Sequence, residues 1–113
     1  MRVVDILPLK LGAVLYPEHE KIKSLIIDEI NSHGSDYEYK KVDADVKRLE
    51  HLDYYSPLSQ DKYKEFREWI ELQAEIYAKE ILNYDTSDFI MTDSWLNVCN
   101  EGGNQNPHFH INA

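Results

Sequence analysis

The final segment of the chain, Pro107 to Ala113, places two histidines two positions apart. In a β-strand, side chains alternate between the two faces, so His108, His110 and Asn112 would share one face. Two such imidazoles are about 6.6 Å apart along the backbone and can lean together onto one ion, at metal–nitrogen distances of about 2.0–2.1 Å. The spacing therefore predicts a metal site on a strand. The alternative is two exposed histidines that bind nothing.

The elements around this segment must position the pair. Phe109 and Ile111 would form the opposite, buried face of the same strand. The preceding stretch, 100–106, consists of Asn, Glu, Gly and Gln only, and predicts a flexible or tightly turned loop. Before it, the stretch 88–100 has apolar residues on both faces and predicts a strand that is covered on both sides. Asn97 within that strand is either a site residue or a hydrogen-bonded core amide.

Two segments, 18–33 and 59–83, have the apolar spacing of amphipathic helices. We expect both to be packed against a sheet that includes residues 89–99. The stretch 3–16 predicts two short strands, or one strand and an extended arm. The polar, tyrosine-rich stretch 35–60 has no clean period and predicts a long connecting segment, with room for a short strand or a turn. The expected core residues are Ile26, Ile30, Phe66, Ile70, Tyr77, Leu96 and Val98.

Composition limits the function further. The 113 residues predict a single domain, spanning 1–113. Twenty-one acidic against twelve basic residues give a net charge of −9, which argues against nonspecific binding to nucleic acid or anionic membranes. No apolar run approaches the roughly 20 residues of a membrane span, and the first residues lack a signal-peptide core. Cys99 is the one cysteine. It indicates a reducing, cytoplasmic setting and is expected to be a buried strand thiol.

The stretch 94–113 resembles a 2-oxoglutarate/iron(II)-dependent oxygenase family of marine bacteria and their phages. Members of that family carry a Trp-Leu-Asn strand, a glycine-containing turn and a Pro-His-x-His-x-Asn segment in this order. The layout of the helical N-terminal half is also similar, although its sequence is far less specific. The residues that carry the resemblance are Trp95, Leu96, Asn97, Gly102, Gly103, Pro107, His108, His110 and Asn112.

The resemblance implies an α+β fold in which N-terminal helices pack on part of a double-stranded β-helix, or jelly roll. It implies iron(II) as the metal, with His108 and His110 as its ligands, and 2-oxoglutarate as the cofactor, with Asn97 in its binding site. Such iron sites use two histidines and one carboxylate and leave open positions for 2-oxoglutarate and dioxygen. A phage-encoded copy would act in the host cytoplasm.

The sequence also departs from the family pattern. No carboxylate stands in the usual His-x-Asp position, so the ligands are either His108 with His110 or, less favoured, His110 with Asn112. In the family, a distal histidine and a 2-oxoglutarate-binding arginine follow this motif. Here the remaining histidines and all arginines precede it: His19, His33, His51, Arg2, Arg48 and Arg67.

We therefore expect an apparently truncated chain, the N-terminal portion of an oxygenase-like domain that is inactive alone. Its terminal strand would leave an exposed edge, which a homo-oligomer or a partner chain would cover. Two further hypotheses remain beside the oxygenase. One is a small, acidic, non-enzymatic interaction or accessory protein. The other is a metal-binding module that is completed by a partner chain or by a homodimer.

Overall fold

A computed structural model describes residues 1–2, 10–33, 37–51, 55–85 and 89–107. Its principal elements are helices α1 (His19–Asn31) and α2 (Lys64–Ile76) and strands β1 (Tyr37–Asp43), β2 (Val46–His51) and β3 (Leu96–Cys99). Two 3₁₀ turns, η1 (Pro57–Ser59) and η2 (Asp61–Tyr63), lead into α2, and a π-helical turn, η3 (Tyr77–Ile81), continues it. The predicted α+β class is confirmed.

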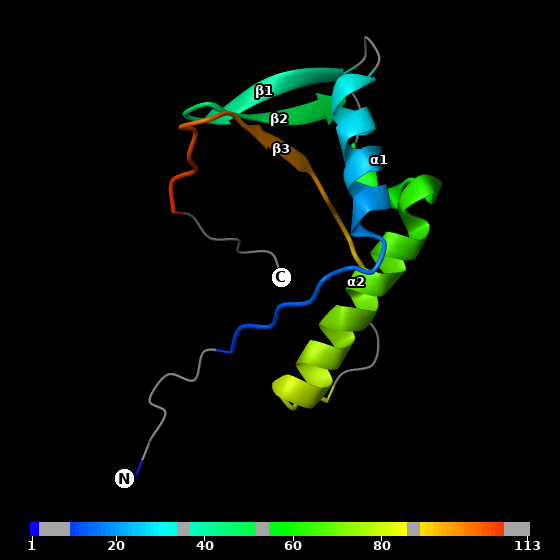
Figure 1. The fold of residues 1–113 in the computed structure, drawn as a ribbon, viewed down its shortest axis with the longest axis vertical. Helices are drawn as coiled ribbons and strands as arrows, with labels where there is room; N and C mark the ends of the chain where they lie inside the picture. The colour runs from blue at the N-terminus through cyan, green and yellow to red at the C-terminus, as the bar shows by residue number, and fades with distance from the viewer. Residues whose placement is uncertain (3–9, 34–36, 52–54, 86–88, 108–113) are drawn as a thin grey trace.

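Helix α1 lies beside one end of the sheet (Figure 1). Ile22 is its buried residue, and the predicted helix over 18–33 is confirmed. The Tyr39 hydroxyl of β1 donates a hydrogen bond of 3.0 Å to the carbonyl of Ile30, near the end of the helix. The ring of Tyr39 also lies 5.3 Å from the imidazole of His33. These contacts attach α1 to the sheet, as the sequence predicts.

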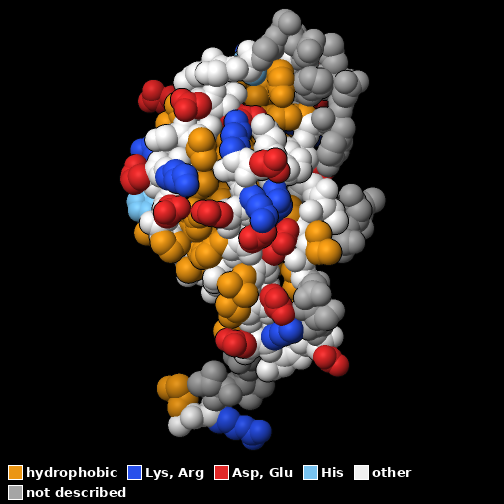
Figure 2. Space-filling view, turned by 90° about the vertical axis from the view of Figure 1, so that its right-hand side faces the viewer, with side chains coloured by type: hydrophobic (Ala, Val, Ile, Leu, Met, Phe, Trp, Pro, Cys, Tyr) orange, Lys and Arg blue, Asp and Glu red, His pale blue; other side chains and the backbone are white. Residues whose placement is uncertain are grey.

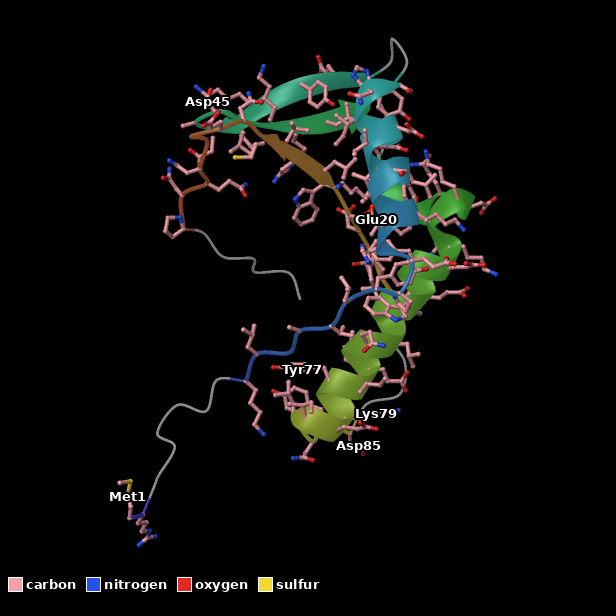
Figure 3. The ribbon with its side chains drawn as sticks, viewed as in Figure 1. Met1, Glu20, Asp45, Tyr77, Lys79 and Asp85 are labelled. Carbon is pink, nitrogen blue, oxygen red and sulfur yellow. The ribbon has the colours of Figure 1, made fainter. Side chains whose placement is uncertain are left out.

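Helix α2 extends away from the sheet (Figure 1), and the predicted helix over 59–83 is confirmed. Its aromatic stripe contacts the N-terminal arm: the Tyr16 ring lies 5.0 Å from the rings of both Phe66 and Trp69. Further along, the Tyr77 hydroxyl donates a hydrogen bond to the carbonyl of Lys10 (Figure 3). The expectation that α2 packs against the sheet is wrong, because the extended arm provides the apolar cover instead.

The sheet has three antiparallel strands in the order β1-β2-β3. Strands β1 and β2 form a hairpin that closes at Asp43 and Val46, with Asp45 in the left-handed region at φ 52°. The sequence prediction of a long connecting segment over 35–60 therefore misses two of the three strands. Its alternating tyrosines and the Asp-Ala-Asp turn carried the signal, but the consecutive charged residues Lys40-Lys41 and Lys47-Arg48 interrupt the alternation.

Strand β3 pairs with β2 through Leu49↔Leu96 and Arg48↔Asn97, and is shorter than the predicted strand. Cys99 at its end is exposed, so the prediction of a buried thiol is wrong. Among the described residues β3 has a neighbour on one side only, which explains the exposure.

The buried apolar residues are few, and all expected core residues are only half-buried. The radius of gyration is 17.4 Å, against about 13 Å for a compact domain of similar length. The arm and α2 project from the sheet, so little apolar surface is enclosed (Figure 1). None of the described helices is long and apolar enough to cross a membrane. The buried apolar side chains are Ile22, Val46, Leu49, Tyr63 and Ala78.

Candidate functional site

The residues predicted to bind the metal, His108 and His110, lie outside the described residues, as does Asn112. Their geometry therefore stays a prediction. Within the described part of the chain, no group of three or more His, Cys, Asp or Glu side chains could hold a metal ion. Asn97, the predicted cofactor-binding residue, is described: it lies on β3 and is half-buried.

Two adjacent glycines form the turn that leads from β3 towards the histidines, as predicted. Gly102 has a φ of 80°, which side-chain-bearing residues rarely adopt. A Cβ on Gly103 would lie 2.7 Å from the Asp45 carbonyl oxygen and 2.8 Å from the sulfur of Cys99. The sequence thus requires glycine twice, once for the backbone conformation and once for close packing against the hairpin.

This turn docks on the β1–β2 hairpin (Figure 3). The Asn100 N–H donates a hydrogen bond of 3.0 Å to the carbonyl of Asp45. Further along, the Asn106 N–H donates to the Asp43 carboxylate. Both ends of the 100–107 loop are therefore fixed against the sheet, and Pro107, the last residue before the histidines, starts from a fixed position.

The docked loop borders an open concavity of about 550 Å³ on one face of the sheet. Small-molecule sites are clefts of about 300–1,000 Å³, so this volume suits a small ligand. Arg48 and Asn97 are direct partners across β2 and β3, so both side chains project from the same face. The concavity is lined by Val42, Asp43, Arg48, Trp95, Asn97, Gln105 and Asn106.

Arg48 is the cation of this concavity. Its Nε donates a hydrogen bond of 3.3 Å to the side-chain oxygen of Asn97. Its guanidinium carbon lies 5.3 Å from the centre of the Trp95 ring, in a cation–π contact. Over the described residues, no carboxylate lies within ion-pair distance of Arg48. The sequence analysis did not select Arg48, because its hairpin was not predicted.

Asp43 contributes the opposite charge to the same concavity. One carboxylate oxygen accepts a hydrogen bond of 2.9 Å from the N–H of Ala44, and the other accepts from the N–H of Asn106. Asp43 therefore anchors the loop. The remaining donors, a guanidinium and side-chain amides, suit a carboxylate ligand. These donors could bind one carboxylate group of a ligand.

A second polar cluster surrounds Glu29 on α1, whose side chain is only 7% exposed. Its carboxylate accepts hydrogen bonds from the Tyr55 hydroxyl at 2.6 Å and from the Gln60 amide at 2.9 Å. The Tyr63 hydroxyl donates at 3.5 Å, and the Lys62 ammonium forms an ion pair. Burial alone would raise the pKa of Glu29, but the hydrogen bonds from Lys62, Tyr55 and Gln60 outweigh it and lower this pKa.

The partners of Glu29 come from the segment before α2, so this cluster joins the two helical parts of the molecule. Burial, reinforced by the charge of Glu29, raises the pKa of Tyr63 to about 12. Burial also raises the pKa of Tyr55, and its hydrogen bond to Glu29 adds to the effect. These groups keep fixed protonation states near neutral pH, with Glu29 ionised and both tyrosines neutral, and the cluster is structural.

The fold and this geometry define an α+β protein with a polar, arginine-containing concavity on a small antiparallel sheet. No family model, curated protein or solved structure matches the chain.

Proposed function

We propose that the chain is part of a 2-oxoglutarate- and iron(II)-dependent oxygenase that acts in the cytoplasm. One observation supports this proposal: two parts of the family-like stretch 94–113 line the same concavity. Trp95, just before β3, and Asn97 on β3 contribute one part of the lining, and Gln105 and Asn106 contribute the other from the loop that leads to the histidines. In this proposal the three antiparallel strands belong to a jelly roll.

The proposed roles follow the motif. Asn97 binds 2-oxoglutarate through its side-chain amide, and His108 and His110 are the iron ligands. When bound, iron(II) supplies dioxygen activation, with 2-oxoglutarate as the source of two of the electrons. The protein's own contribution is to orient the cofactor on the concave face and to limit the access of water there. The docked glycine turn fixes where the histidine segment begins.

An anaerobic titration tests this function. The protein is mixed with iron(II) and 2-oxoglutarate, and the visible absorption band of a chelated iron–2-oxoglutarate complex is recorded. We expect a band that requires both components and is lost in His108→Ala and in His110→Ala. His19→Ala, which removes an exposed histidine of α1, is the matched control and should retain the band. A band that survives both His108→Ala and His110→Ala, or no band at all, would contradict the proposal.

An apolar groove supports a second function, that of a non-enzymatic interaction protein. Residues 10–14 and helix α2 line a groove of about 580 Å³. Leu11 and Val14 in this groove are 96% and 61% exposed. On a different side of the molecule, shown in Figure 2, hydrophobic side chains also lie between charged ones on the surface. The occupant in this second proposal is another copy of the chain, which would bury the side chains of the groove in a homo-oligomer.

Light scattering over a range of protein concentrations tests the second function. We expect a dimer that Val14→Asp converts to a monomer. Ile90→Asp, at a site that is 76% exposed and outside the groove, should leave the dimer intact. A monomer at every concentration excludes self-association as the function of the groove.

A further inference from the structure

We infer that Arg48 is the carboxylate-binding residue of the concavity, and that this site takes a compact carboxylate anion. The identification of 2-oxoglutarate as the physiological ligand rests on the proposed function. The anion site itself is argued from the side chains of β2, β3 and the docked loop, and does not need a metal.

The contacts of Arg48 hold its guanidinium in place without occupying all of it. Nε is engaged by Asn97, and one face of the guanidinium lies towards the Trp95 ring. These contacts restrict the rotation of a long side chain and orient its planar group. Within the described residues, the two terminal nitrogens make no hydrogen bond or ion pair, and they form the fork that binds carboxylates with two parallel hydrogen bonds. Arg48 is therefore oriented for a ligand before the ligand arrives.

Several exposed lysines of the described chain are already paired with carboxylates. Lys62 pairs with the buried Glu29, Lys79 pairs with Glu75 at 2.6 Å, and Lys40 pairs with Glu50 at 3.1 Å. Arg48 has no such partner in the same part of the chain, although the net charge is −9. A half-buried guanidinium without an anion bears a desolvation cost that a bound carboxylate would offset.

The surroundings of Arg48 favour an anion despite one acid in the concavity. Asp43 already accepts hydrogen bonds from two backbone N–H groups, which disperse part of its charge. Asn97 gives its oxygen to Arg48, so its amide nitrogen is the part that remains to donate. Guanidinium and amide donors thus lie next to each other on one face of the sheet. Trp95 covers the guanidinium and lowers its hydration, which strengthens its attraction for a carboxylate.

Titration of the metal-free protein with 2-oxoglutarate and with succinate tests this inference, read by ¹H–¹⁵N NMR. We expect saturable shifts of the Trp95 indole N–H and the Asn97 side-chain amide with both acids, and none with neutral dimethyl succinate. Arg48→Gln should weaken binding at least tenfold. Lys47→Gln removes the same charge from the neighbouring residue on the opposite face of β2, and should change the affinity less than twofold.

Failure has distinct forms here. Unchanged affinity in Arg48→Gln, or shifts that are spread over the whole chain, would overturn the site. If the circular dichroism spectrum shows that Arg48→Gln is unfolded, the inference is tested on the wild-type protein alone. It is then refuted if the ligand does not shift the NMR signals of Trp95 and Asn97. If the metal-free protein binds carboxylates but forms no iron-dependent absorption band, the anion site is supported and the oxygenase function is refuted. If the absorption band persists in a folded Arg48→Gln variant, the oxygenase function is supported and the proposed role of Arg48 is refuted.

Discussion

Two regions of this molecule are built around a partly or fully buried charge, and they treat it differently. At the helix junction, Glu29 receives hydrogen bonds or an ion pair from Tyr55, Gln60, Tyr63 and Lys62. In the concavity of the sheet, Arg48 has one hydrogen bond and one aromatic contact. The first charge is saturated by its own chain, and the second keeps donors available.

This difference separates a structural charge from a binding one. A buried ion with a full set of partners holds elements together, because removing any partner leaves an unsatisfied group. An ion that is positioned but incompletely paired has capacity for a ligand. The comparison predicts that changes at Glu29 alter stability above all. Changes in the concavity should alter ligand binding above all.

The largest effect is expected from Glu29→Ala. It removes the acceptor shared by two tyrosines, an amide and Lys62, and so disconnects α1 from the segment before α2. We expect the free energy of unfolding to fall by about 2–3 kcal/mol, as is typical for the loss of a buried, hydrogen-bonded charge. Urea unfolding followed by circular dichroism measures this.

The matched control is Glu20→Ala, which removes an exposed carboxylate from the first turn of the same helix. Its effect should stay within about 0.5 kcal/mol, as for most surface substitutions. Equal losses from Glu20→Ala and Glu29→Ala would mean that the cluster does not stabilise the junction.

The pH dependence of stability is the second test of the junction. The pKa of Glu29 lies below its usual 4.5, so its stabilisation is complete above that pH and is lost as the pH falls through the lowered value. The pKa of Tyr63 is raised from 10.0 to about 12, so the neutral form stabilises the fold and stability falls as the pH rises through that interval. Urea midpoints in Tyr63→Phe should show a smaller alkaline decline, because the raised pKa of Tyr55 still contributes to it. A decline unchanged by this substitution would contradict the assignment.

Both helices were predictable from sequence, because their apolar spacing is regular over several turns. The β1–β2 hairpin was not, since Lys40, Lys41, Lys47 and Arg48 interrupt its alternation. The packing of α2 was also not predictable. Periodicity identifies an apolar face but does not say what covers it, and here Tyr16 of the extended arm lies against that face.

The candidate site divides in the same way. Asn97 and the glycine turn could be selected from the sequence, because both belong to one short, ordered motif. Arg48 lies 49 residues away in the chain from Asn97 and meets it only through strand pairing. Such a long-range contact leaves no local pattern. Asp43 was missed for the same reason, since its partner Asn106 is 63 residues away.

A smaller loss of stability is expected from Ser94→Ala, two residues before β3 begins. The Ser94 hydroxyl contacts the buried Ser56 hydroxyl at 2.9 Å and accepts the N–H of Leu58 at 3.0 Å. Its loss should cost about 1 kcal/mol, because two polar groups lose a partner. Ser24→Ala, on the exposed face of α1, is the control and should be nearly neutral. Indistinguishable urea midpoints for the two variants would show that this contact does not hold β3 in place.

The smallest effect on stability, and the sharpest test of the comparison, is expected from Asn97→Asp. The new carboxylate would face Arg48 across the strand pair and saturate it, as Lys62 is saturated by Glu29. Stability should change by less than about 1 kcal/mol, the usual range for a partly exposed ion pair. Binding of 2-oxoglutarate should nevertheless weaken at least tenfold, because an internal anion now competes for the guanidinium. Gln73→Glu adds the same charge on α2 and should leave binding unchanged. Retained affinity in Asn97→Asp would show that ligand binding does not depend on the open donors of Arg48.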